Sequence, residues 1–262
     1  MEFISILLSS LIFIGSPIGF ALDTIAESAL RSRLSGVEDI QVRVDSGSNL
    51  NLLKGKIKRL QIGARGVYPV TGFRVAIADL DTDPIDLDFS SLKRGNVVLD
   101  EPLNGALHVV ITPEDLNQYL LSPEFTERLN NIELNLGNAA QSREVGRYQF
   151  SNPKATFLAD NRLQLELDLS EPSLGEGLKI KAQTSFTIEN GHRLVLLNPQ
   201  VSVNDSAAPE QLLDAFTENL GDRLSLRRLE DSGVTTRILD ATISPEQFDL
   251  VMWVSIDPSF TR

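Results

Sequence analysis

The sequence predicts an α+β fold that is mostly β, with a long curved antiparallel sheet wrapped around one or more helices. Three observations predict it: long stretches that alternate apolar and polar residues, a two-residue turn signal between two such stretches, and a few helix starts marked by capping residues. The 262-residue chain has a hydrophobic content of 42%, which is ordinary for a folded protein. No Gly/Ser-rich linker divides residues 22–262, so we expect a single domain there.

Residues 1–21 are predicted to be a signal peptide or a membrane anchor. No charged residue occurs from Phe3 to Leu22, and about 20 apolar residues suffice to cross a bilayer as a helix. The segment GSPIG shortens the apolar run, and Gly19 and Ala21 suit a cleavage site, although no basic residue precedes the run. A cleaved export signal, a retained anchor and a buried core helix all remain open. We expect an exported protein of the periplasm or envelope, either free or anchored through residues 3–22.

Helices are expected at both ends of the chain and between strands. Apolar spacing predicts helices over residues 22–36 and 209–220. A hydroxyl residue followed by Pro and Glu predicts further helix starts at Thr112, Ser122 and Ser244.

Strands are expected over most of the remaining chain. Leu163, Leu165, Leu167 and Leu169 alternate with polar residues, and residues 178–188 continue this alternation. Asn190-Gly191 then supplies the two residues of a type I′ turn, which predicts a hairpin with strands of about 10 residues. In residues 53–62 the apolar phase changes near Lys58, and we expect a bulge that bends one continuous strand.

The composition argues against most enzymes and against nucleic-acid binding. A net charge of −12 is the opposite of a nucleic-acid-binding domain, and the chain has no Cys and only His108 and His192. None of the common catalytic or nucleotide-binding motifs is present. Residues 79–90 are rich in Asp but have Pro84 and Ser90 where a calcium loop needs Gly and Glu. We therefore expect no enzymatic activity, no cofactor and no metal.

A cluster of basic residues stands out in this acidic chain. Between Asp45 and Asp79 there are six Lys or Arg residues and no acid. One interpretation is ion pairing with the acidic residues 79–88, and the other is attraction to anionic lipid head groups. The head-group candidates are Lys54, Lys56, Lys58, Arg59 and Arg65. Residues 221–229, with Arg223, Arg227 and Arg228 beside leucines, are a second candidate for contact with a membrane surface.

Taken together, these segments resemble the LmeA-like phospholipid-binding family over most of residues 22–256. The resemblance rests on the order of the segments LDTIAESALRSRLSGVEDIQVRV, GKIKRLQIGARGVYP and TDPIDLDFSSLKRGNVVLDEPLNGALHVVITPEDLNQYL. It implies non-enzymatic binding of a phospholipid or other membrane lipid at the bacterial envelope. It also implies a fold similar to tubular lipid-binding proteins, in which a curved sheet leaves an apolar groove.

Strands that are apolar on both faces are our candidates for lining such a groove, although burial beneath a helix explains them equally well. These candidates are Phe73, Val75, Ile77, Leu250, Met252, Trp253 and Val254. The expected partners are a lipid and a membrane surface, with no nucleic acid and an unknown protein partner. The alternative functions are a structural or adaptor protein of the envelope and, less favoured, a hydrolase that works through carboxylates.

Overall fold

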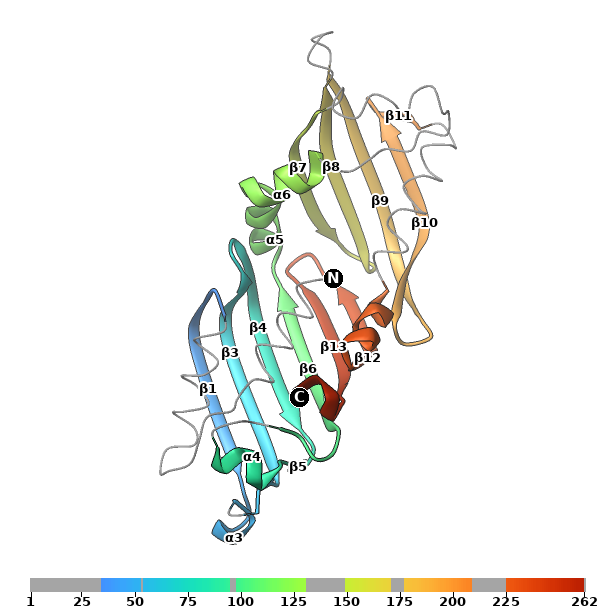
Figure 1. Cartoon of the computed structure of the whole chain (residues 1–262). Coiled ribbons are helices and arrows are strands. Elements are labelled where there is room, and N and C mark those ends of the chain that lie inside the picture. Colours follow the sequence, from blue (N-terminus) through green and yellow to red (C-terminus); the bar gives the residue numbers. More distant parts are fainter. Residues whose placement is uncertain are drawn as a thin grey trace.

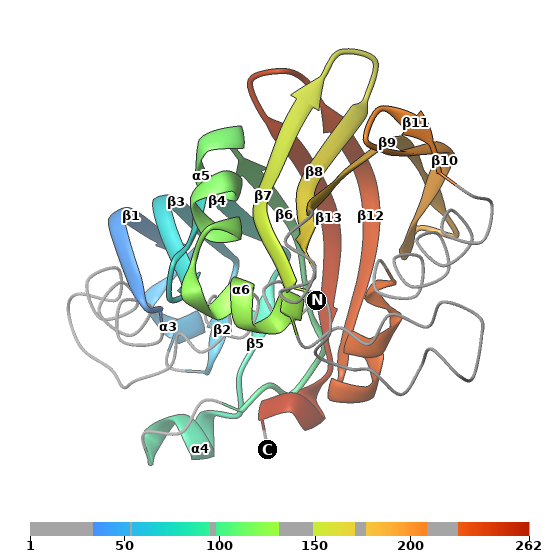
Figure 2. The ribbon, with the colours of Figure 1, turned by 90° about the horizontal axis from the view of Figure 1, so that it is seen from above.

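The computed structural model describes residues 34–52, 54–94, 98–130, 149–170, 177–208 and 225–261. Most of these residues lie in two large antiparallel sheets, which confirms the α+β, mostly β class. The two sheets follow one another along the long axis of the molecule (Figure 1). Seen along that axis, the strands are bent ribbons, and the helices α5 and α6 lie beside strand β7 (Figure 2).

The first sheet has six strands contributed by two distant parts of the chain. Its order is β1 (Gly36–Asp45), β3 (Arg59–Val70), β4 (Phe73–Thr82), β6 (Leu103–Ile111), β13 (Phe248–Ile256) and β12 (Val234–Ile243). β13 pairs with β6 from Phe248↔Ile111 to Ile256↔Leu103, so two segments that are far apart in the sequence lie side by side. The second sheet is therefore an insertion between β6 and β12.

The hydrophobic core lies on the inner face of the six-stranded sheet. Alternate residues such as Ile62, Leu80 and Leu107 are at most 5% exposed, while their neighbours in sequence face outward. Among the described residues, Leu226 and Leu229 of the 3₁₀ helix η2 (Leu226–Ser232) also belong to this core. The alternation therefore gives this sheet one closed, apolar face.

The second sheet has five strands in the order β11 (Ser206–Ala207), β10 (Arg193–Val203), β9 (Gly177–Glu189), β8 (Arg162–Ser170) and β7 (Gln149–Leu158). The predicted hairpin between β9 and β10 is confirmed, with Asn190 at φ 52° and Gly191 at φ 66°. Both values lie in the left-handed region that a type I′ turn requires.

The turn of this hairpin joins the two sheets. The Gly191 carbonyl accepts a hydrogen bond from the Ile238 amide of β12 at 2.5 Å, and the His192 carbonyl accepts one from the Leu226 amide at 2.8 Å. The rings of Phe186 and Phe248 pack edge to face with their centroids 6.4 Å apart. Backbone hydrogen bonds and apolar packing thus hold the second sheet against β12 and β13.

Two of the three predicted helix starts are confirmed. α5 (Pro113–Leu120) begins after Thr112, whose hydroxyl accepts a hydrogen bond from the Asp115 amide at 3.1 Å. α6 (Pro123–Asn130) begins after Ser122, whose hydroxyl accepts one from the Phe125 amide at 3.2 Å. The short helices α3 (Asn49–Leu52), α4 (Phe89–Lys93) and η3 (Pro258–Thr261) complete the described helices.

The predicted helix start at Ser244 is wrong. Ser244 lies in the tight turn between β12 and β13, where its amide donates to the Gln247 carbonyl at 2.9 Å. Phe248 already begins β13 and pairs with Ile243 and Ile111, so too few residues remain for a helical turn. Strand pairing therefore overrides the local capping signal.

The phase change near Lys58 is real, but the expected bulge in one continuous strand is wrong. Lys56 and Ile57 form β2 and pair with β5 (Ile85–Asp86) in a separate two-stranded sheet, while Arg59 begins β3. Lys58 lies between the strands and its amide donates to the Asp45 carbonyl at 2.8 Å. The chain changes partner at Lys58, and that change shifts the alternation.

The helices expected over residues 22–36 and 209–220 fall outside the described residues, except that Gly36 already begins β1. In the part of the chain that the structure describes, no helix is long and apolar enough to cross a bilayer.

Candidate functional site

Three of the basic residues on β2 and β3 make ion pairs with acidic residues of β4 and β5. Lys56 Nζ lies 2.8 Å from an Asp86 oxygen, and Arg65 lies 2.5 Å from Asp79. Arg59 forms an ion pair with Asp81, and the hydrogen bonds from Arg59 hold the pKa of the Asp81 carboxyl below its ordinary value. For Lys56, Arg59 and Arg65, the structure therefore contains the ion pairs with residues 79–88 that one of the two interpretations predicted.

Lys58 makes a longer ion pair, and Lys54 makes none with the described residues. Lys58 Nζ approaches Asp45 only to 3.5 Å, and its side chain is 67% exposed. Within the described ranges, the exposed Lys54 makes no ion pair. A head-group role for the five basic candidates stays a prediction, and Lys54 and Lys58 retain the most freedom to fulfil it.

The groove candidates divide between the two faces of the six-stranded sheet. Ile77 and Trp253 are half-buried, whereas the others lie in the core, 6% exposed or less: Phe73, Val75, Leu250, Met252 and Val254. The five core residues fill the inner face of this sheet, whereas the outer faces of β4 and β13 are only half-buried. Their contact with a lipid stays a prediction.

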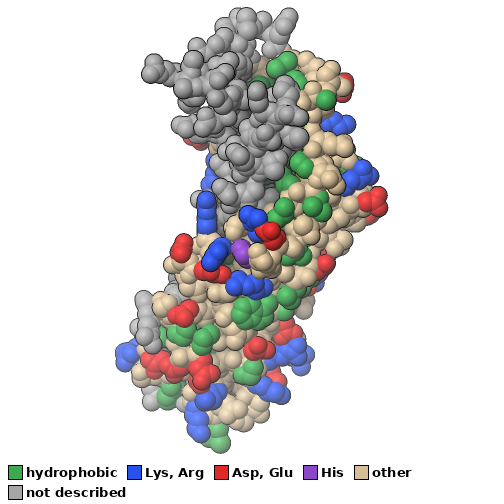
Figure 3. All heavy atoms as spheres, turned by 90° about the vertical axis from the view of Figure 1, so that its right-hand side faces the viewer, with side chains coloured by type: hydrophobic (Ala, Val, Ile, Leu, Met, Phe, Trp, Pro, Cys, Tyr) green, Lys and Arg blue, Asp and Glu red, His purple; other side chains and the backbone are tan. Residues whose placement is uncertain are grey.

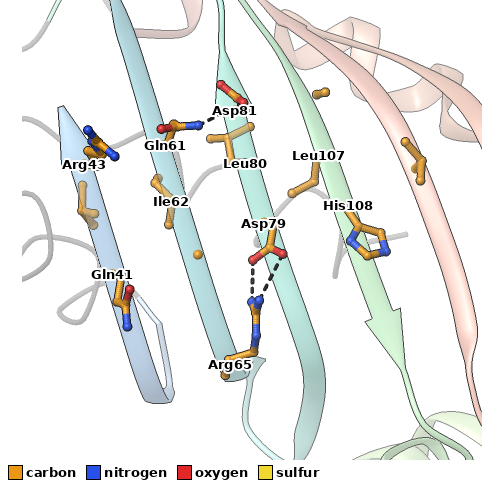
Figure 4. A pocket seen from close by; sticks show the side chains of 14 residues that line it. Gln41, Arg43, Gln61, Ile62, Arg65, Asp79, Leu80, Asp81, Leu107 and His108 are labelled. Atoms are coloured by element: carbon orange, nitrogen blue, oxygen red, sulfur yellow. Dashed lines mark hydrogen bonds and ion pairs between the residues drawn. The ribbon is translucent and has the colours of Figure 1, made fainter. Parts of the chain in front are cut away.

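A hollow of about 580 Å³ lies on the outer face of the six-stranded sheet (Figure 4). Gly63 lacks a side chain at its centre, and a Cβ there would meet only the Asp79 carboxylate at 3.5 Å. The labelled polar side chains come from neighbouring strands: Gln41, Arg43, Gln61, Arg65, Asp79, Asp81 and His108.

The chemistry of this hollow does not suit an acyl chain. The Arg65 guanidinium is bound to the Asp79 carboxylate, and the Gln61 amide donates to Asp81 at 3.3 Å. Laying a methylene chain there would remove these polar groups from water without giving them new partners. The hollow can accept polar groups, and an acyl chain requires another surface.

The inner face of the five-stranded sheet supplies an apolar surface that the protein leaves partly open. Leu163, Leu165, Leu167 and Leu169 of β8 lie on this face, and all four are half-buried. The register extends the face across β9, where Leu165 pairs with Ala182, Leu167 with Ile180 and Leu169 with Leu178. Leu178, at the end of this face, is 41% exposed.

One row across this face combines small and large apolar residues. Ala155, Leu165, Ala182 and Val201 form one row across four strands, and both alanines are buried. Larger side chains lie on either side of this row, with Phe157 and Leu163 on one side and Leu167 and Ile180 on the other. The row therefore joins two buried alanines to two larger apolar side chains on one apolar face of the sheet.

The β8 leucines were not among the predicted site residues, although their alternation was visible in the sequence. Strands that are apolar on both faces were predicted to line a groove, but five of their seven candidate residues lie in the core. The available signal was the regular alternation of β8, which places its leucines on one face.

The described residues offer little for metal chemistry: among them, no three His, Asp or Glu side chains cluster as metal ligands. Leu226 and Leu229 of η2 are buried in the core, so the prediction that the leucines of residues 221–229 contact a membrane is wrong for these two. What the described geometry offers is an apolar sheet face with half-buried leucines and a set of exposed basic residues.

Comparison with known proteins gives one match. The model of a family described as LmeA-like phospholipid-binding matches residues 15–250. No curated protein and no solved structure matches the chain significantly.

Proposed function

Because the chain belongs to the LmeA-like phospholipid-binding family, we propose that it holds the acyl chains of a phospholipid on the inner face of β7–β10. The observation that carries this proposal is the difference between the two sheets. The inner face of the six-stranded sheet is closed, whereas the β8 leucines on the inner face of the second sheet are half-buried.

The energetic argument favours an apolar ligand on this face. Removing apolar surface from water stabilises a complex by about 25 cal/mol per Å². Each half-buried leucine of β8 therefore gains from contact with a methylene chain. The polar residue next to Ala182 on this face, Thr184, already has partners, because its hydroxyl donates to the Ser185 and Leu197 carbonyls.

The test is a pair of charge-introducing variants on opposite faces of the same sheet. Leu165→Glu places a carboxylate on the leucine face, and Gln183→Glu places one on the outer face beside Ala182. Phospholipid that copurifies with each variant is extracted and quantified by mass spectrometry, and circular dichroism checks the fold.

We expect Leu165→Glu to retain at least about tenfold less phospholipid than the wild type, because an unpaired carboxylate would face the acyl chain. Gln183→Glu should retain wild-type amounts. A folded Leu165→Glu protein with unchanged lipid content would refute this location.

We further propose that the protein works without catalysis at the cell envelope and moves lipid between membranes. Transfer of a fluorescent phospholipid between donor and acceptor vesicles tests the movement, and fractionation of cells tests the location. If the protein bound lipid but never transferred it between vesicles, the proposal of transfer would be wrong and storage would replace it.

A further inference from the structure

We propose that the end of the molecule formed by α3 docks on the surface of an anionic lipid bilayer. The docking end is defined by Leu50, Lys54 and Lys58. It lies opposite the five-stranded sheet along the long axis of the molecule (Figure 1). Docking is a separate property from the holding of acyl chains, because the two surfaces share no residue.

Leu50 supplies the apolar part of the docking end. It is 68% exposed, more than any other large hydrophobic side chain reported for the described residues. Figure 3 shows a hydrophobic side chain and basic side chains together at this lower end of the molecule. A leucine with so much of its surface in water gains free energy when it enters the apolar boundary of a bilayer.

The segment around Leu50 is well fixed by hydrogen bonds. The Gly47 amide donates to the Asp45 carboxylate at 2.9 Å, and the Asn51 side chain donates to the Ser46 carbonyl at 3.1 Å. The Lys54 amide in turn donates to the Asn51 carbonyl at 2.9 Å. The exposure of Leu50 is thus built into a turn and is not the result of a frayed end.

Two lysines flank this leucine and supply the charge. Lys54 follows α3 by two residues, and Lys58 lies against the same turn, since a Cβ on Gly47 would be 3.7 Å from Lys58 Cδ. The carboxylates nearby lie beside Lys56 and Lys58: Asp86 pairs with Lys56, Asp100 and Glu101 also interact with Lys56, and Asp45 lies 3.5 Å from Lys58. In a protein with a net charge of −12, the exposed Lys54 and Lys58 favour the approach of this end to an anionic membrane.

The experiment measures flotation of the full chain with vesicles of equal parts phosphatidylcholine and phosphatidylglycerol. Leu50→Asp removes the apolar part, and Leu121→Asp is its matched control, because Leu121 is 63% exposed but lies at the end of α5. Lys54→Gln and Lys58→Gln remove the charge, with Lys154→Gln on β7 as their control.

We expect the wild type to float with these vesicles and Leu50→Asp to bind about tenfold more weakly. Each lysine variant should bind about fivefold more weakly. Both control variants should bind like the wild type. A wild type that does not float, or a Leu121→Asp variant that loses as much binding as Leu50→Asp, would overturn the proposal.

The lipid content of the same proteins separates docking from the proposed function. Leu50→Asp should still copurify with phospholipid, and Leu165→Glu should still float. If Leu50→Asp lost its bound lipid and kept its flotation, the assignment of this end would be wrong.

Discussion

At the residue scale, two buried threonines differ in the hydrogen bonding of their hydroxyl groups. Thr236 on β12 is 1% exposed, and its hydroxyl has no hydrogen-bond partner among the residues that the structure describes. Thr184 on β9 is 5% exposed, and its hydroxyl donates to the carbonyls of Ser185 and Leu197 at 2.9 and 3.2 Å. A buried polar group without a partner destabilises the folded state, whereas a satisfied one contributes to its stability.

Replacement of each threonine by valine should therefore have opposite effects. Thr236→Val removes an unsatisfied hydroxyl and should raise the free energy of unfolding by about 1 kcal/mol, whereas Thr184→Val should lower it by a similar amount. Urea denaturation followed by circular dichroism measures both. A loss of stability in Thr236→Val would mean that its hydroxyl does find a partner.

Asp88 links stability to pH at the start of α4. The Ser90 hydroxyl donates to its carboxylate at 2.7 Å and the Ser91 hydroxyl at 2.8 Å, and these hydrogen bonds hold the pKa of Asp88 well below its usual range. A pKa lowered by folding stabilises the protein fully above the unfolded value of about 3.9, and this stabilisation is lost as the pH falls toward the folded value.

Asp88→Asn should therefore be less stable than the wild type at pH 7, and the difference should shrink below about pH 4. Urea midpoints at a series of pH values measure this. Ser90→Ala should show the same convergence to a smaller extent, because it removes one of the hydroxyl donors. A difference between Asp88→Asn and the wild type that stays constant with pH would contradict the assignment.

At the element scale, α5 protects the free edge of the second sheet. The Asn117 amide donates to the Ala155 carbonyl at 2.7 Å and accepts a hydrogen bond from the Ala155 amide at 2.8 Å. Asn130 of α6 accepts a hydrogen bond from the Phe150 amide at 2.8 Å. Two asparagine side chains thus form hydrogen bonds with backbone groups of β7 that could otherwise pair with a strand of another chain.

Asn117→Ala should destabilise the protein by about 1–3 kcal/mol, because it leaves both groups of the buried Ala155 without partners. Hydrogen exchange of the Ala155 amide should accelerate. The exposed neighbour Gln118 provides the control, and Gln118→Ala should leave both the exchange rate and the stability unchanged. Equal protection of Ala155 in the wild type and in Asn117→Ala would show that the helix does not protect this edge.

Elements were predictable from the sequence where their signals are local. The caps at Thr112 and Ser122 and the turn at Asn190-Gly191 act within four residues, and all three form as expected. The similar signal at Ser244 fails because Phe248 pairs with a strand more than 130 residues away in the sequence. The change of sheet at Lys58 likewise depends on distant Asp86, so its phase shift was visible but its cause was not.

The candidate site was predictable to a smaller extent for the same reason. Alternation placed the four β8 leucines on one face, but whether that face is closed depends on which other parts of the chain pack against it. Burial of Met252 and half-burial of Leu167 are products of long-range packing that no local pattern contains.

At the scale of the whole molecule, the two sheets differ in how completely the side chains on their inner faces are buried. The six-stranded sheet has a core in which Leu107 and Met252 are fully buried, and ion pairs such as Arg65–Asp79 bridge neighbouring strands on its outer face. The second sheet has its half-buried leucines on β8. If a lipid completes this second sheet, the ligand contributes to the stability of one part of the molecule more than to the other.

Removal of bound lipid should therefore loosen the two sheets unequally. A ligand present at 100 times its Kd stabilises the state that binds it by about 2.7 kcal/mol, and delipidation removes this amount. We expect hydrogen exchange to accelerate in β8 and β9 after extraction with detergent, while β4 and β13 keep their protection, because their inner face is closed by protein. Readdition of phospholipid should restore the slow exchange. If instead β4 and β13 lost protection on delipidation, the lipid would lie against Phe73, Val75, Leu250, Met252 and Val254, and the six-stranded sheet would be the one that a ligand completes.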